Sequence, residues 1–175
     1  MPFSSRRIRI ASWIALILFA PSAAATQIQL EGGRSYTGSS DTAAIFAEAV
    51  FNPRRIGDSA FSWAPDVSVG AITGRDMTCY GLSRYGVTDN VYLVAAGARF
   101  HYADESRWYH RLFFSFQPAL QTGRTMALST RYEFVSTLGW QGRSVSVQIR
   151  HISNGSTGGP NRGETMALVG VAFGR

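Results

Sequence analysis

A histidine and a serine two residues apart, His151 and Ser153, are the residues of this chain best suited to nucleophilic catalysis. They continue a row in which Val145, Val147 and Ile149 alternate with polar residues, the period of a β-strand with one apolar face. Residues i and i+2 of a strand share a face, so the imidazole and the hydroxyl are expected side by side. An adjacent imidazole can take the serine proton and turn the hydroxyl into a nucleophile.

The residues that follow can complete a catalytic site. The imidazole needs an orienting acceptor, and Glu164, at the start of the next expected strand, can supply a carboxylate. Gly155 and the other glycines of this segment allow a tight turn with accessible backbone N–H groups, while Asn154 and Asn161 offer amide donors for an oxyanion. The same residue types are equally typical of an ordinary hairpin loop. Alternation in the last strand fits either face, so the direction of Glu164 stays open.

Period-two alternation recurs along the rest of the chain, in stretches of about ten residues, the length that a tilted strand needs to cross a membrane. It predicts strands over residues 27–34, 43–52, 61–69, 92–102, 114–121, 132–141, 144–153 and 165–173. We therefore expect an all-β fold, an eight-stranded antiparallel outer-membrane β-barrel over residues 26–175.

The two faces of these strands differ in a way that favours a membrane barrel. Aromatic residues fall near the ends of the apolar faces, as in the girdles of membrane barrels: Phe61, Tyr92, Tyr102, Tyr132 and Trp140. The opposite faces collect charges that can pair inside a small barrel: Glu48, Asp66, Arg99, Glu133 and Arg150. A soluble β-sandwich shows the same alternation, so period alone does not separate the two folds.

The first 25 residues have the order of a secretory signal peptide. Arg6, Arg7 and Arg9 precede an apolar run over residues 10–20, and small residues follow up to Ala25, after which we expect cleavage. The run is short for a membrane-spanning helix, although an uncleaved anchor is the alternative. With the barrel pattern, this signal predicts export to the bacterial outer membrane.

Charge argues against a nucleic-acid partner. The formal net charge of +6 falls to +3 without residues 1–25, which carry three arginines and no acid, and no basic run or base-reading motif is present. Several arginines fall in the connections expected to face outward, where guanidinium groups can bind lipopolysaccharide phosphates or remain solvated: Arg34, Arg75, Arg84, Arg124 and Arg162.

Other reactive residues form no recognisable site. Cys79 is the only cysteine, which excludes an internal disulfide, and no Cys/His cluster indicates zinc, so we expect neither a metal nor a cofactor. We interpret a group near the connection between the fourth and fifth strands as solvated turn residues: His101, Asp104, Glu105 and His110.

The segment from Arg150 to Glu164, RHISNGSTGGPNRGE, resembles the motif of the lipid A 3-O-deacylase family of the PagL type. That motif has a His-x-Ser-Asn stretch, a Pro-Asn-x-Gly turn and then an acid. The resemblance implies an eight-stranded barrel with His151 as base, Ser153 as nucleophile, Glu164 as orienting acid and Asn154 in the oxyanion region. The spacing from His151 to Glu164 is one residue shorter than in the family pattern.

These observations predict a serine esterase that removes an ester-linked hydroxyacyl chain from lipid A, its membrane-embedded partner, with position 3 implied by the resemblance. Arg162 and Arg124 are the candidates for contact with substrate phosphate. Two alternatives remain: an outer-membrane phospholipase that uses the same residues, and a non-enzymatic structural or adhesion barrel. Whether the chain is a monomer or a homodimer is left open.

Overall fold

The structure is a computed structural model that describes residues 25–38, 40–75, 90–123, 125, 127–157 and 162–174. Of the expected signal peptide only Ala25 is described, as the first residue of a strand, and Cys79 also lies outside the described residues. Within these ranges, no helix is long and apolar enough to cross a membrane.

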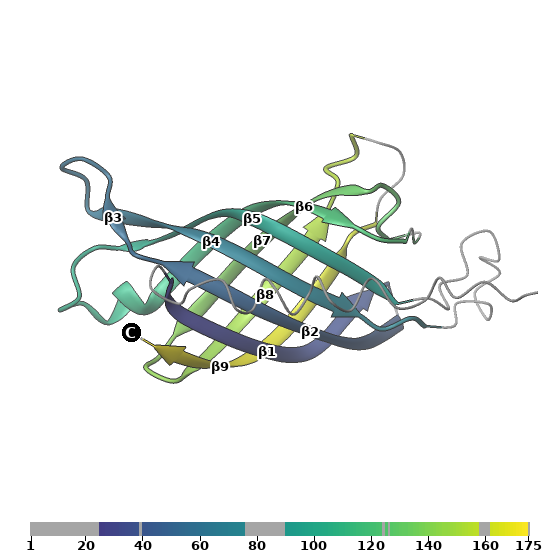
Figure 1. The fold of residues 1–175 in the computed structure, drawn as a ribbon, viewed down its shortest axis with the longest axis horizontal. Coiled ribbons are helices and arrows are strands. Elements are labelled where there is room, and N and C mark those ends of the chain that lie inside the picture. Colours follow the sequence, from purple (N-terminus) through teal and green to yellow (C-terminus); the bar gives the residue numbers. More distant parts are fainter. Residues whose placement is uncertain are drawn as a thin grey trace, which may run out of the picture.

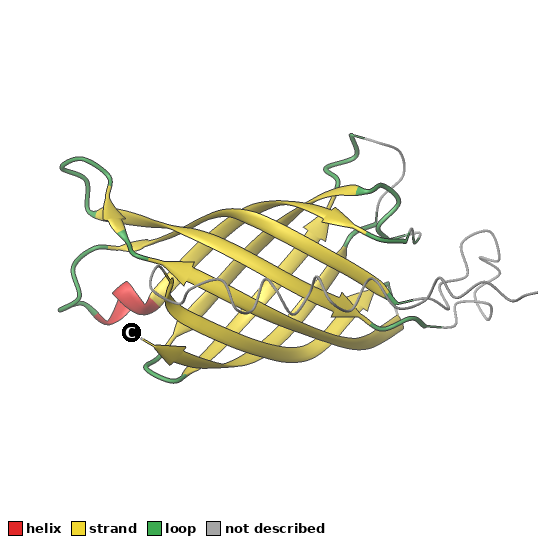
Figure 2. Ribbon diagram, viewed as in Figure 1, coloured by secondary structure: helices red, strands yellow, loops and turns green. Residues whose placement is uncertain are grey.

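Eight long strands form one closed antiparallel barrel, which confirms the expected fold (Figures 1 and 2). Each strand pairs with the next one along the chain, β1 pairs with β9, and β2 pairs with β4. The strands are β1 (Ala25–Thr37), β2 (Ser40–Phe51), β4 (Phe61–Ile72), β5 (Val91–Tyr102), β6 (Leu112–Gln121), β7 (Tyr132–Gln141), β8 (Val145–Ser153) and β9 (Glu164–Gly174).

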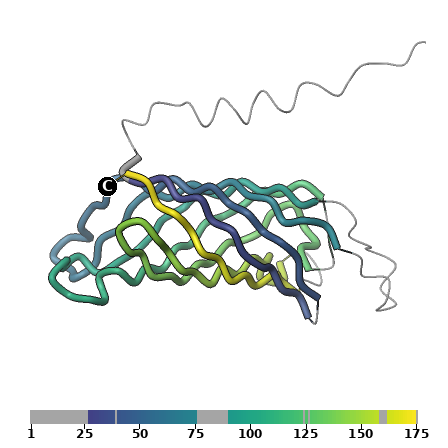
Figure 3. The backbone as a smooth tube through the Cα atoms, turned by 90° about the horizontal axis from the view of Figure 1, so that it is seen from below, coloured from purple at the N-terminus to yellow at the C-terminus, as the bar shows by residue number. Residues whose placement is uncertain are grey.

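Two short elements were not expected from the sequence. Strand β3 (Arg54–Arg55) pairs with β4 in the connection from β2, and a 3₁₀ turn (Trp108–Arg111) precedes β6. Both lie at the end of the barrel that carries the C-terminus, which is called the terminal end. The connection from β8 to β9 lies at the opposite end, which is called the site end (Figures 1 and 3).

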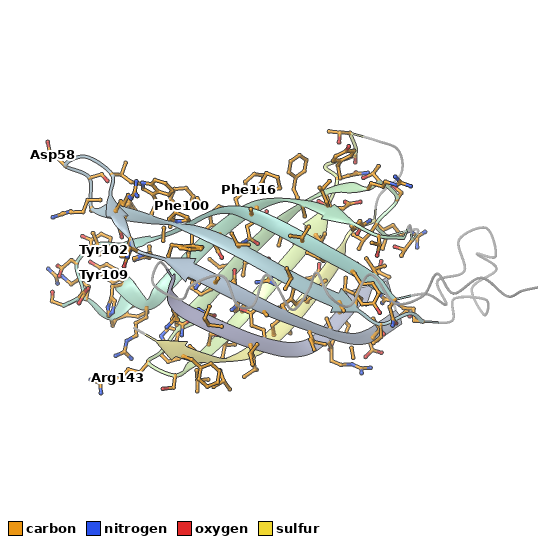
Figure 4. All side chains as sticks on the ribbon, in the orientation of Figure 1. Asp58, Phe100, Tyr102, Tyr109, Phe116 and Arg143 are labelled. Carbon is orange, nitrogen blue, oxygen red and sulfur yellow. The ribbon has the colours of Figure 1, made fainter. Side chains whose placement is uncertain are left out.

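The outer surface of the barrel is apolar and its interior is polar. Leu138 and Ile149 are 62% and 59% exposed, and Phe100 and Phe116 project away from the barrel wall (Figure 4). Aromatic residues stand exposed near both ends of this surface, as the sequence predicts: Phe61, Tyr92, Tyr132 and Trp140. Strand alternation therefore turns the apolar faces outward, the reverse of a soluble sandwich.

Two arginines and three acids form an ion-pair network inside the barrel. Arg150 Nη2 lies 3.1 Å from both Glu31 Oε2 and Glu48 Oε2. Arg99 contacts Glu48 at 3.0 Å and Asp66 at 3.4 Å. These charges are shielded from solvent and form ion pairs with one another, which is the pairing expected for charges in a side-chain-filled interior.

The main buried hydrophobic cluster of the interior lies toward the site end. Ile72, Leu128, Ile152 and Met166 belong to a buried hydrophobic cluster there, and Ile152 and Met166 are fully shielded from solvent. Because Ile152 on β8 and Met166 on β9 alternate with outward-facing residues, their side chains pack directly behind the outer surface of these two strands. This packing fixes the backbone that carries His151.

Candidate active site

His151 and Ser153 both lie on the outer surface of the barrel at the site end. On β8, Gln148, Arg150 and Ile152 point inward and are buried, while His151 is exposed and Ser153 is half-buried. The alternation read from the sequence thus places both side chains correctly. Among the described residues no hydrogen bond joins the Ser153 hydroxyl to the His151 ring. Such catalytic contacts are often loose before substrate binds.

The His151 ring is held by a threonine of the neighbouring strand. His151 and Thr165 are Cα partners in the β8–β9 ladder, and the His151 Nδ1 atom lies 2.9 Å from Thr165 Oγ1. With its proton on Nδ1, the ring donates to this hydroxyl and leaves Nε2 free to accept a proton. In a serine-hydrolase arrangement, an acceptor at the position of Thr165 would orient the imidazole.

Glu164 does not take the position that the sequence analysis assigned to it. It is the Cα partner of Ile152, so its side chain points into the barrel and is almost fully buried. Its Oε2 atom accepts a hydrogen bond from Ser35 Oγ at 2.5 Å, and its Oε1 atom lies 2.5 Å from Arg75 Nη2. The expected contact with His151 is not made, because the two side chains lie on opposite faces of the barrel wall.

The physical reason is the position of Glu164 in the β9 ladder, where it pairs with the inward-facing Ile152. Successive residues of a strand point to opposite faces, so a shift of one residue moves a side chain from the outer to the inner surface. Glu164, 13 positions after His151, faces inward, and Thr165, one position later, faces outward.

The turn after β8 is built by Asn154. The side chain of Asn154 is 1% exposed, and its Oδ1 atom accepts the Ser156 backbone N–H at 2.8 Å. Its Nδ2 atom lies 3.4 Å from both Ser129 Oγ and Thr130 Oγ1. Asn154 follows Ser153 and turns away from the outer surface, so it shapes the loop and its amide is not directed at an oxyanion on Ser153.

The other predicted loop residues are placed only in part. Gly155 is exposed with a φ of +61°, and Arg162 is exposed at the end of the loop. Asn161 and Arg124 lie outside the described residues. Arg75, expected in a solvated connection, instead has its guanidinium almost buried against Glu164, where it also donates to the Ser40 carbonyl at 3.0 Å.

Gly163 has no side chain, and this leaves room for the His151 ring. A Cβ atom at this position would lie 2.6 Å from His151 Cε1, and the residue has a left-handed φ of +70°. Its backbone N–H donates to the Ala127 carbonyl at 3.0 Å, which fixes it under the ring. Glycine is therefore required for two reasons, the backbone conformation and the close approach of the imidazole.

We predict that Gly163→Ala lowers kcat/KM about tenfold, because a ring displaced by even about 1 Å loses its alignment with the nucleophile. The matched control is Gly155→Ala. Gly155 has a similar φ of +61°, but a Cβ there would meet nothing within 4 Å. Both variants carry the cost of a left-handed alanine, about 1–2 kcal/mol, and Gly163→Ala should lower the melting temperature further because its Cβ also meets the His151 ring and the Ile152 carbonyl. Equal kcat/KM in the two variants would contradict the contact with His151.

Two stacked phenylalanines, Phe116 of β6 and Phe134 of β7, lie on the β7 side of Ser153. Phe134 is the Cα partner of Ser153, and its ring stacks on that of Phe116 at 5.7 Å between centroids. Ser136 is the Cα partner of His151, so a small residue lies next to the stacked rings of Phe116 and Phe134. The surface beside Ser153 can therefore accept a hydrocarbon chain on its apolar side.

A second serine–histidine pair was missed in the sequence because its members lie far apart in the chain. Ser62 Oγ lies 3.2 Å from His101 Nδ1 across the β4–β5 ladder, near the terminal end. A hollow of about 400 Å³ lies at this end, lined by Arg55, Ala60, Tyr102, Ala103 and Asp104. Only cross-strand pairing could have revealed this pair.

The turn cluster expected at the terminal end is only partly a turn, because Asp104 and Glu105 are exposed there, whereas His101 lies in β5, half-buried against Ser62. Ser106 donates to Asp104 Oδ1 from both its hydroxyl and its backbone N–H, and these hydrogen bonds lower the pKa of the Asp104 carboxyl. The ring of His110 contacts the carbonyl of Arg107. Over the described ranges, no three His, Cys, Asp or Glu side chains are grouped as a metal site.

Comparisons with protein-family models, curated proteins and solved structures found no match to this chain. A proposal for its function therefore rests on His151 and Ser153 of β8, on Thr165 of β9 and on the apolar surface around them.

Proposed function

We propose that the chain is a bacterial outer-membrane esterase that removes the ester-linked hydroxyacyl chain at position 3 of lipid A. One observation supports this above all: a serine and a Thr165-bound histidine share the apolar outer surface of a barrel whose interior is polar. A nucleophile and base at that surface face the membrane itself, where acyl chains are found.

The membrane location is supported by the inverted polarity of the barrel. Large apolar side chains are exposed on all eight strands, whereas a soluble monomer rarely exposes a contiguous apolar surface of this kind. A closed barrel satisfies its backbone hydrogen bonds internally and so can lie in hydrocarbon. An apolar exterior with exposed aromatics near both ends is typical of outer-membrane barrels.

The site end is assigned to the outer face of the membrane. Outer-membrane barrels usually keep both termini in the periplasm and carry their longer connections outside. The longest connection, between β4 and β5, lies at the site end, opposite the C-terminus. Ser153 then lies at the level of the outer leaflet, whose characteristic lipid is lipid A, and position 3 follows from the motif resemblance.

The proposed reaction is acyl transfer through the serine. His151 Nε2 takes the Ser153 proton as Oγ attacks the ester carbonyl, and the tetrahedral intermediate collapses by releasing the sugar hydroxyl, which takes the proton from the imidazolium. Water, activated in turn by His151, then hydrolyses the acyl-serine and releases the hydroxy fatty acid. Thr165 keeps the ring in the required tautomer. Backbone N–H groups of the turn after Ser153 are assigned to the oxyanion.

The test is mass spectrometry of lipid A after incubation with refolded wild-type protein in detergent. The proposal expects loss of one hydroxyacyl chain and release of the matching free fatty acid. Phospholipid vesicles with and without calcium form the second arm. Cleavage of phospholipid alone would replace the proposal by a phospholipase. Cleavage of neither lipid by protein shown to be folded would leave a non-enzymatic barrel.

A further inference from the structure

An ion pair, Arg34–Asp41, stands on the apolar outer surface and belongs to the same cross-strand row as His151. In the ladders across β8, β9, β1 and β2, His151 pairs with Thr165, Thr165 with Tyr36, and Tyr36 with Asp41. These four residues form one row around the barrel. Arg34, two residues before Tyr36 on the same face of β1, directs its guanidinium to Asp41 and so reaches this row.

The guanidinium of Arg34 is open to a ligand. Its Nε atom donates to Asp41 Oδ2 at 2.7 Å, its Nη2 atom contacts the same oxygen, and within the described residues its Nη1 atom has no hydrogen-bond partner. The side chain is 54% exposed, and its Cα partners on both neighbouring strands, Ala43 and Ala167, are too small to cover it.

We propose that Arg34 binds a phosphate monoester on the headgroup of the lipid whose acyl ester Ser153 attacks; this inference rests on the proposed function. Guanidinium groups bind phosphate with paired, charge-assisted hydrogen bonds. The guanidinium, held by Asp41 of β2, lies up to three strands from β8 and about two residues along the strands from Ser153, roughly 15 Å at about 4.8 Å per interstrand step and about 3.3 Å per residue. A phosphorylated disaccharide can span this distance.

The setting of Arg34 separates it from an ordinary surface arginine. A charge on the outer surface of a membrane barrel is unfavourable unless it faces a polar group, which marks it as functional. Asp41 holds the guanidinium in the cross-strand row of His151, and the exposed Tyr36 occupies the position in that row next to Thr165. A headgroup with its ester at Ser153 and its phosphate at Arg34 lies over Tyr36.

The kinetic test compares two substrates, a phosphorylated glycolipid and the same lipid after phosphatase treatment. We expect Arg34→Gln to raise KM about tenfold for the phosphorylated lipid and to leave the dephosphorylated lipid within about twofold, as expected for a lost charge-assisted contact. Arg34→Lys should give a KM for the phosphorylated lipid between those of the wild type and Arg34→Gln. The control, Arg143→Gln, changes an exposed arginine at the terminal end and should alter neither KM. Equal losses on both lipids, or none, would overturn the proposal.

A binding measurement keeps this inference separate from the proposed catalysis. In protein carrying Ser153→Ala, native mass spectrometry in detergent should show the phosphorylated glycolipid bound more tightly than its dephosphorylated form. The added Arg34→Gln change should remove this preference. If wild-type protein cleaves neither lipid but the preference is present and depends on Arg34, the esterase fails and the phosphate site stands. If inorganic phosphate competes at low millimolar concentration, the site recognises free phosphate as well as the headgroup. Absence of any preference overturns the site.

Discussion

Replacing Ser153 by alanine should lower kcat/KM for lipid A by at least about 10⁴-fold, the scale of loss when a serine nucleophile is removed. His151→Ala should cost a similar factor, and the double variant little more, because the two residues act as one unit. Initial rates of hydroxy fatty acid release measure all three. Both side chains lie on the outer surface and contribute little to packing, so the variants should fold as the wild type does.

The second serine–histidine pair of the barrel supplies the control. Ser62→Ala and His101→Ala remove the contact near the terminal end, and both should retain wild-type kcat/KM within about threefold, since neither side chain reaches the outer surface at the site end. A large loss in Ser62→Ala with activity retained in Ser153→Ala would move the active site to the terminal end and contradict the proposal.

The fold was predictable from period-two alternation because successive residues of a barrel strand face the apolar outer surface and the polar interior in turn. On β6 and β7 every apolar residue of the predicted outer row is indeed outside. The predicted first strand stopped at Arg34, three residues before the end of β1. Gly32 and Gly33 interrupt the side-chain pattern there, but the backbone ladder with β2 and β9 continues, since hydrogen bonds between strands need no apolar side chain.

The positions of the candidate site residues were predictable only where alternation allows a single assignment of faces. The row from Val145 to Ser153 is unambiguous, and the structure places His151 and Ser153 accordingly. On β9 both faces carry apolar residues, because Met166 and Leu168 enter the hydrophobic cluster at the site end. The direction of Glu164 was therefore undetermined until its partners, Arg75 and Ser35, were known from segments far away in the chain.

Glu164 and Thr165 are neighbours on β9 whose side chains lie on opposite faces of the barrel wall and make different contacts. Inside the barrel, Glu164 ties the start of β9 to Ser35 of β1 and to Arg75 after β4. Outside, the next residue presents its hydroxyl to His151. A buried acid that anchors the backbone thus places Thr165 without touching the imidazole. Thr165→Val and Glu164→Gln should accordingly have different effects.

Thr165→Val should lower kcat about 100-fold and leave KM within about twofold, since loss of the Nδ1 acceptor frees the ring to rotate and to change tautomer, within the range that acid–base catalysis contributes. The melting temperature should not fall, because valine suits an apolar outer surface. Thr165→Ser keeps the hydroxyl and should restore most of the activity. A loss of the same size in Thr165→Ser would show that the methyl group, not the hydroxyl, matters.

Glu164→Gln should lower stability and leave kcat nearly unchanged. It leaves the Arg75 guanidinium without a carboxylate in a nearly buried position, so the free energy of unfolding should fall by about 1–3 kcal/mol, while kcat at temperatures below the transition should stay within about threefold. Urea unfolding in lipid vesicles measures the first quantity and initial rates measure the second. If Glu164→Gln instead loses kcat with unchanged stability while Thr165→Val retains it, the carboxylate must reach His151 during turnover. Glu164 rather than Thr165 would then orient the base.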